Sequence, residues 1–154
     1  MFFTKQHGSV AFQDGSALSI TFDDVGDWTL DGIQEGQKGT AAILHRGAFK
    51  SYVYTDQTQV TGSFSFTVKA QDFSNPSNAR ALDAIRKTGT WSAATTTNPG
   101  SFGPFTGKLV YTATADGQTG TLEIDYARLS VSINESGDAL TASVSFTGYL
   151  GAVT

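Results

Sequence analysis

The sequence predicts a mainly β protein: an antiparallel β-sandwich or barrel with one short flanking α-helix and a long loop or arm. Three observations point to this fold class. Apolar residues alternate with Ser and Thr over long stretches, Asp-Gly and Ser-Gly-Asp turns separate these stretches, and a single segment has helical spacing. With 154 residues the chain has the length of one domain, 1–154, and can bury one hydrophobic core.

The alternation is clearest in residues 60–68 and 140–146. Each stretch places apolar side chains on one face and Ser or Thr on the other, the pattern of a strand that is buried on one side. Hydroxyl side chains keep the outer face wet without making it charged. The core faces are expected to hold Val60, Phe64, Phe66, Val68, Leu140, Ala142, Val144 and Phe146.

A change of phase marks the longest strand. Apolar residues occupy even positions in 122–126 and odd positions in 129–133, so the phase slips near Ala127-Arg128. A slip of this kind predicts a bulge or bend, which a sandwich or barrel needs where a strand turns a corner.

Further strands are expected at 9–13 and 16–22, joined by Asp14-Gly15 as a two-residue hairpin turn. Residues 28–34, 49–54 and 109–114 are further candidates.

One segment, Asn78–Lys87, has the spacing of a helix with one apolar face, and cations in its last turn suit the helix dipole. Gly89 is a suitable stop signal. Residues 35–47 and 92–107 contain Gly and mixed polarity and are interpreted as long loops or extended arms. Loops of this length within one domain usually bind something.

The composition excludes several classes of function. The chain has no Cys and therefore forms neither disulfides nor thiolate metal sites. Its net charge is −4 and its 10 Lys and Arg residues are scattered, whereas nucleic-acid binding needs clustered positive charge. No apolar run approaches the ~20 residues of a membrane span. The first residues lack the apolar core of a signal peptide. We expect a soluble protein made in a cytoplasm, with no membrane partner.

Catalytic and metal sites are not expected, and no cofactor is implied. His7 and His45 are the only histidines, and no Gly-x-Ser-x-Gly nucleophile motif is present. Asp23, Asp24 and Asp27 lack the spacing of a calcium-binding loop and indicate a solvated turn.

The order of elements resembles that of bacteriophage tail tube proteins. The resemblance covers most of the chain. It is carried by residues 36–47 leading into 49–54, then 59–69 and the short helix, and by the closing stretch 120–148. It implies an arm, a β-sandwich with one flanking helix, and two long C-terminal strands. It also implies hexameric rings stacked into a tube within a virion tail, contacts with other tail proteins, and a lumen through which DNA passes.

Two sets of residues follow from this resemblance as candidate sites. Residues 36–47 would be an arm, poorly ordered in the free subunit, that docks on a neighbouring subunit. The contact candidates within it are Lys38, Ile43, Leu44, His45 and Arg46.

The polar faces of the long strands would point into the lumen, where like charge keeps DNA from sticking. The candidates are Glu123, Asp125, Ser143 and Ser145. A second interpretation makes Glu123 and Asp125 a catalytic acid–base pair. It is the weaker one, because two side chains that share a face of a strand do not by themselves mark a cleft.

Two alternatives to the tube subunit remain. One is another virion β-domain, such as a tail terminator, a decoration protein or a minor tail protein. The other is a carbohydrate-binding β-sandwich, which would need aromatic side chains side by side on an exposed face. The aromatic candidates for that face are Trp28, Trp91, Tyr52 and Tyr54.

Overall fold

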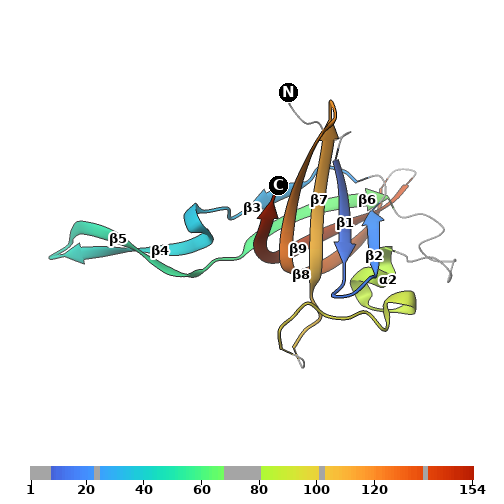
Figure 1. The fold of residues 1–154 in the computed structure, drawn as a ribbon, viewed down its shortest axis with the longest axis horizontal. Coiled ribbons are helices and arrows are strands. Elements are labelled where there is room, and N and C mark those ends of the chain that lie inside the picture. Colours follow the sequence, from blue (N-terminus) through green and yellow to red (C-terminus); the bar gives the residue numbers. More distant parts are fainter. Residues whose placement is uncertain (1–7, 23–24, 68–80, 101–102, 137–138) are drawn as a thin grey trace.

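The computed structural model describes residues 8–22, 25–67, 81–100, 103–136 and 139–154, which form a β-structure with one short helix (Figure 1). The elements, in chain order, are β1 (Gly8–Gln13), β2 (Ser19–Phe22), β3 (Thr29–Asp31), the 3-10 turn η2 (Glu35–Gln37), β4 (Lys38–His45), β5 (Ala48–Gln57), β6 (Val60–Thr67), α2 (Ala81–Arg86), the 3-10 turn η3 (Gly89–Trp91), β7 (Gly107–Ala115), β8 (Gln118–Ser136) and β9 (Ala139–Val153). Seven strands form one antiparallel sheet in the order β2-β1-β7-β8-β9-β6-β3, while β4 and β5 pair only with each other.

The seven-stranded sheet folds over on itself because β8 and β9 bend. The register of this pair shifts between Asp125 and Arg128, with one extra residue on β8, and Tyr126 there has a φ of 53°. The bulge predicted near Ala127-Arg128 is thereby confirmed. Before the bend β8 runs between β7 and the end of β9, in the layer that also contains β1. After the bend, β8 and β9 run with β6 in a crossing direction (Figure 1). The result is the expected sandwich-like arrangement, with strands that turn a corner from one layer to the other.

Close backbone approach at the corner requires a glycine on β9. A Cβ atom on Gly148 would lie 2.6 Å from Ile124 Cγ2 and 2.8 Å from the carbonyl oxygen of Asp125. Both distances are too short for carbon, so the corner fits only a residue without a side chain at this position.

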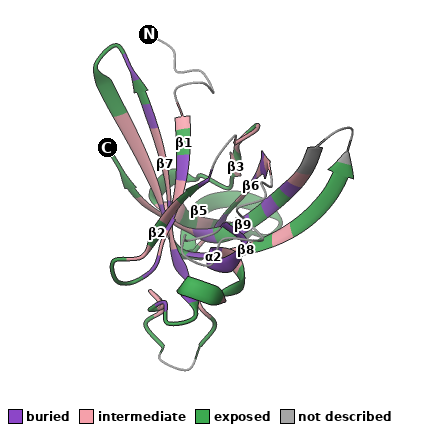
Figure 2. Cartoon of the chain, turned by 90° about the vertical axis from the view of Figure 1, so that its right-hand side faces the viewer, coloured by how far each residue is buried: buried purple, intermediate pink, exposed green. Residues whose placement is uncertain are grey.

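The core lies where the two layers face each other (Figure 2). Phe22 on β2 packs against Phe64 and Phe66 on β6, with ring centroids 5.0 and 5.2 Å apart, which joins strands that are distant in the sheet order. The alternation in 60–67 and 142–146 is confirmed, while the side chains of Val68 and Leu140 lie outside the described residues. The largest fully buried side chains are Trp91, Phe12, Phe66, Phe146, Leu109, Ile124, Val10, Val60 and Val144.

The predicted flanking helix is present as α2, which packs against β2 and β8 through its buried face, including Leu82 and Ala84. The expected start, residues 78–80, lies outside the described residues. The helix ends at Arg86, one residue earlier than predicted, because Lys87 has a φ of 58° and leaves the helical conformation.

The connection between β1 and β2 is longer than predicted. It spans residues 14–18 and is not a two-residue turn, because the Asp14 carboxylate organises it. This carboxylate accepts hydrogen bonds from the amides of Ser16 (2.9 Å) and Leu18 (3.1 Å) and from the Ser16 hydroxyl (2.8 Å). It also accepts one from the amide of Thr95 (2.9 Å), which fastens the long loop 92–106 to the sandwich.

Replacing Asp14 with Ala is expected to destabilise the fold by about 1–3 kcal/mol, since the amides of Leu18 and Thr95 lose their acceptor. Burial raises the pKa of Asp14, but the hydrogen bonds from Thr95, Ser16 and Leu18 outweigh it and lower that pKa below its ordinary value. The stabilisation is therefore complete above the ordinary Asp pKa of about 3.9 and lost as the pH falls through the lowered value.

Urea unfolding of the wild type and of Asp14→Ala, repeated from pH 7 to pH 2.5, measures this effect. The two curves should be well separated at neutral pH and converge below about pH 4. Asp56→Ala, at an exposed position on the arm, is the matched control. Equal stability of wild type and Asp14→Ala at pH 7 would contradict the assignment.

Candidate assembly surfaces

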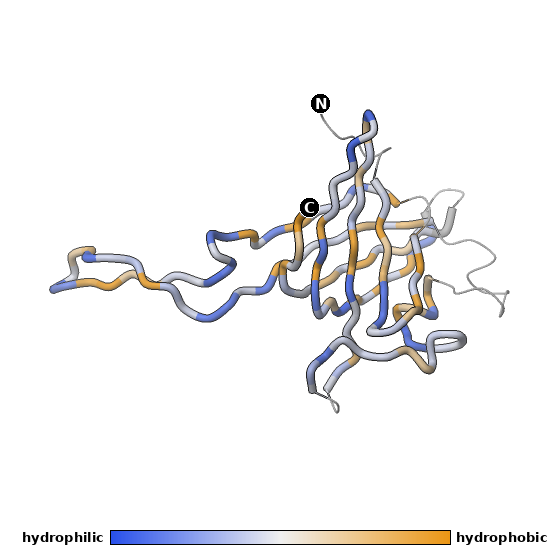
Figure 3. The backbone as a smooth tube through the Cα atoms, viewed as in Figure 1, coloured by the Kyte–Doolittle hydropathy of each residue, from blue (hydrophilic) through white to orange (hydrophobic). Residues whose placement is uncertain are grey.

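The first surface is a β-hairpin, β4–β5, that projects from the sandwich; we call residues 38–57 the arm (Figure 1). Residues 36–47 were expected to form a long loop or extended arm. The structure gives this arm a regular form, because the stretch contains the whole of β4 and the turn that follows it. Strand alternation is invisible in Ala41-Ala42-Ile43-Leu44 because both faces of the strand are apolar. The arm is exposed almost throughout, and apolar stretches run along it (Figure 3).

The arm has two apolar faces, and a β-bulge in β5 decides which side chains lie on each. The register shifts between Ile43 and Leu44 because β5 carries one extra residue, and this brings Phe49 to the same side as Tyr52, with ring centroids 4.8 Å apart. Cross-strand register then assigns the remaining side chains. The aromatic face contains Leu44, Phe49, Tyr52 and Tyr54; the aliphatic face contains Ala41, Ile43 and Val53.

The exposed large hydrophobic side chains are concentrated on this arm. Tyr52 is 70% exposed and Phe49 is 59% exposed. Among the described large hydrophobic side chains that are exposed, Ile43, Leu44, Phe49, Tyr52, Val53 and Tyr54 on the arm outnumber those of the rest of the chain. Sequence reasoning named Ile43 and Leu44 for the arm. It predicted a strand at 49–54 and singled out Tyr52 and Tyr54, but it did not assign this strand to the arm. The signal was the Arg46-Gly47 turn between two apolar runs, which is typical of a hairpin.

Gln37 clasps the base of the arm. Its side-chain amide donates to the carbonyl of Gly32 (2.8 Å) and to the hydroxyl of Thr58 (3.3 Å), and its Oε1 accepts from the amide of Gln34 (3.2 Å). The incoming and outgoing chains are thus tied together where the arm begins.

Beside the clasp, the Tyr54 hydroxyl donates a hydrogen bond to the Glu35 carboxylate. This bond, and then the negative charge of Glu35, raise the pKa of Tyr54. Glu35, Thr40, Tyr52, Val53 and Tyr54 line an open hollow of about 480 Å³ at this place. We call it the cup.

The second surface is the outer face of the layer formed by β3, β6, the first half of β9 and the second half of β8. It consists mainly of hydroxyl side chains in register, with Ser63, Ser145 and Ser130 side by side on three strands. Ser130 Oγ lies 3.1 Å from Ser145 Oγ, and Thr29 Oγ1 lies 3.0 Å from Ser63 Oγ. We call this the hydroxyl face.

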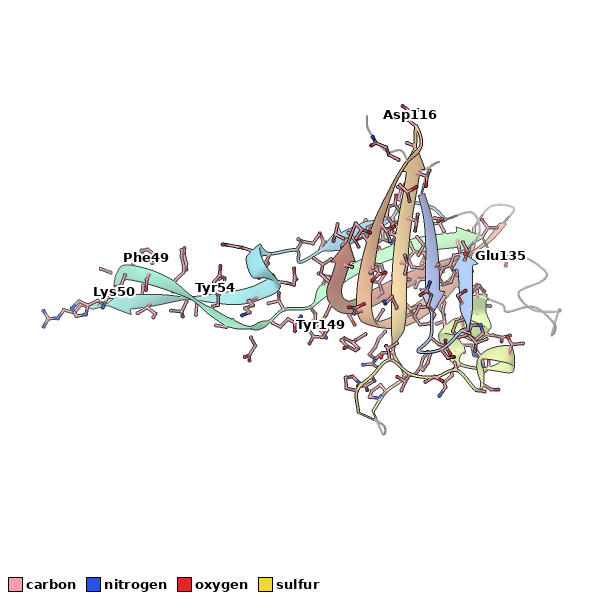
Figure 4. All side chains as sticks on the ribbon, in the orientation of Figure 1. Phe49, Lys50, Tyr54, Asp116, Glu135 and Tyr149 are labelled. Atoms are coloured by element: carbon pink, nitrogen blue, oxygen red, sulfur yellow. The ribbon has the colours of Figure 1, made fainter. Side chains whose placement is uncertain are left out.

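Of the lumen candidates, Ser143 and Ser145 are exposed on the hydroxyl face. Glu123 and Asp125 lie on β8 before the bend, on the outer face of the other layer. Figure 4 shows the two ends of β8 far apart, near Asp116 and at Glu135. The bend therefore separates the four candidates into two pairs, on the outer faces of different layers. Glu123 also forms an ion pair with Lys108 on β7, with Oε2 3.3 Å from Nζ.

The two tryptophans of the carbohydrate-binding alternative are not brought together with its two tyrosines. Trp91 is fully buried in the core, and Trp28 stacks on Tyr111 at 4.7 Å. Tyr52 and Tyr54 lie two positions apart on β5, both exposed on the aromatic face of the arm, so these two of the four candidates share a surface.

The remaining candidates of the sequence are scattered. His45 lies next to the turn of the arm, and His7, Asp23 and Asp24 lie outside the described residues. In the part of the chain that the structure describes, no group of three or more His, Cys, Asp or Glu side chains is placed to hold a metal ion. No helix of that part is long and apolar enough to span a membrane.

No protein-family model matches this chain, and no curated protein is significantly similar to it in sequence. Solved structures do share its fold. A chain in the sheath/tube terminator of the extracellular contractile injection system PVC, in the extended state, matches with a TM-score of 0.58 at 12% identity, covering 100% of this chain and 96% of that one. A chain in the PVC sheath-tube complex, also in the extended state, matches with a TM-score of 0.56 at 12% identity, covering 99% of this chain and 90% of that one.

A third similar structure is the tube-terminating cap of the anti-feeding prophage, with a TM-score of 0.57 at 8% identity, covering 100% of this chain and 91% of that one. The structural neighbours are thus chains of phage-tail-like contractile injection systems, among them a tube terminator and a terminating cap. At these identities the likeness shows a shared fold.

Proposed function

We propose that this chain is a structural subunit of a phage-type tail tube, assembling as hexameric rings stacked into a tube in the virion tail. The observation that carries the proposal is the arm, a hairpin with apolar side chains on both faces that the chain's own sandwich does not cover. Contiguous exposed apolar patches mark protein contacts. A ribbon that is apolar on both sides needs two surfaces to cover it, and neighbouring copies in a ring or stack supply them. The shared fold supports the same role.

We infer that the hydroxyl face lines the channel. Its side chains are mainly Ser and Thr, and its groove beside β3 holds one acid and one base, Asp31 and Arg128. A neutral, hydroxyl-covered wall offers DNA phosphates no cluster of cations to bind, so DNA passes without sticking. Under this proposal Ser143 and Ser145 face the lumen, while Glu123 and Asp125 lie on the outer wall.

A tube terminator is the second candidate function. It is favoured by the likeness to chains of a tube terminator and a terminating cap along nearly their whole lengths. A terminator closes a tube with one ring, so it requires ring formation without repeated stacking.

Negative-stain electron microscopy of the purified chain, at increasing protein concentration, separates these functions. Stacked rings forming tubes are expected. Single rings that never stack would favour the terminator function over the tube-subunit function. A chain that stays monomeric at every concentration, both alone and mixed with preformed tubes of its own tail, would overturn both.

A further inference from the structure

Charge is distributed unevenly along the arm. The far end carries His45, Arg46 and Lys50, and no acidic residue lies between Lys38 and Asp56 (Figure 4). Around the base, Glu35 and Asp56 accompany Lys38. Within the described residues, Arg46 and Lys50 have no recorded ion-pair partner. The far end of the arm is therefore a basic tip without a counter-charge of its own.

Arg46 occupies a turn position that does not suit it. Its φ is 51° and that of Gly47 is 81°, the pair of left-handed conformations of a tight hairpin turn, where Asn or Gly at the first position costs least. The turn presents the Arg46 side chain at the exposed tip of the arm.

The cup has the chemistry to receive such a cation. Its carboxylate, Glu35, is held by the Tyr54 hydroxyl, and the rings of Tyr52 and Tyr54 form part of its wall. An Arg or Lys head between a carboxylate and aromatic rings gains both a charge-assisted hydrogen bond and a cation–π contact.

The tip cannot reach the cup of its own arm. Thr40 in the cup and Arg46 at the tip are separated by most of β4, which at ~3.3 Å per residue is roughly 20 Å of paired strand. A paired strand does not fold back over that distance, so Arg46 reaches a cup only on another chain.

We propose that the basic tip of one copy's arm, through Arg46 and Lys50, seats in the Glu35 cup of a second copy. The contact joins two different patches on identical chains, so it is heterologous and propagates through a ring or a stack. The apolar faces of the arm supply most of the burial, and the tip and cup set the register between copies. This inference rests on the proposed tube function and names the partner and the register of the arm.

A charge-swap series tests it. Arg46→Glu/Lys50→Glu reverses the tip and Glu35→Lys reverses the cup. Each is expected to raise the protein concentration at which assembly is half complete by roughly tenfold, measured by sedimentation velocity. The triple variant, carrying both reversals, should recover assembly toward the wild-type concentration. Thermal unfolding of each variant as a monomer should match the wild type, since none of these residues lies in the core.

The outcomes distinguish this contact from the function on which it rests. The tip–cup contact is wrong if the tip reversal and the cup reversal each assemble as the wild type does. It is also wrong if the triple variant assembles no better than either reversal. In both cases the tube function still stands on the wild-type tubes. If the wild type itself forms neither rings nor tubes, the function fails first, and the contact fails with it.

Discussion

Removing the arm is expected to abolish assembly and to leave the sandwich folded. The change replaces Gly39–Asp56 with a short Gly/Ser linker between the clasped ends of the hairpin. Both strands must go, because removing 38–46 alone would leave β5 as an unpaired apolar strand. β4 and β5 pair only with each other and contribute nothing to the core, so the free energy of unfolding should change by no more than about 0.5 kcal/mol.

Electron microscopy and thermal unfolding of the same preparations measure both expectations. Leu44→Ser/Tyr52→Ser is the matched variant, since it keeps the hairpin backbone and removes two side chains of the aromatic face. It should also fail to form tubes, which would assign the effect to apolar burial. Tubes of normal appearance from the linker variant would exclude the arm from assembly, and an unfolded monomer would show that the arm belongs to the fold.

Thiol labelling of assembled tubes is expected to distinguish the two outer faces of the sandwich. The chain has no Cys, so each single-Cys variant carries one reactive group. Ser145→Cys is exposed in the single chain and should react with a bulky polymer-linked maleimide there, but become unreactive toward it in tubes. A small maleimide, which diffuses into the channel, should still label it.

Glu123→Cys provides the opposite probe, because it lies on the other layer. It should react with both reagents in tubes, and Ser143→Cys should behave like Ser145→Cys. The reverse pattern, with Glu123→Cys protected from the bulky reagent and Ser145→Cys reactive, would place the acids in the lumen and the hydroxyl face outside.

Much of the sandwich could be predicted because its strands are buried on one side only. The burial of Val60, Phe64 and Phe66 follows from alternation with hydroxyl residues, and the change of phase near Ala127-Arg128 located the bend. The pairing of distant strands could not be predicted in this way. No local pattern indicates that Phe22 meets Phe64, since that contact depends on how the whole sheet folds over.

The candidate site was predicted less well, and the reason is physical. Alternation detects a strand only when water lies on one side, and the arm has apolar residues on both sides, so β4 had no periodic signal. The β1–β2 turn was misjudged for another reason. The Asp14 side chain replaces backbone hydrogen bonds within the turn, and Thr95, its distant partner, is brought near only by the fold.

The bent strands have a mechanical consequence. Because β8 and β9 each run through both layers, the layers are connected twice by continuous backbone at the corner. A force that pulls the layers apart is therefore transmitted along covalent bonds. The hydrogen bonds of the antiparallel ladder lie perpendicular to the strands and share the strain in shear. In the proposed tube, two copies are held together only by non-covalent contacts, whereas the two layers within one copy are joined by continuous backbone.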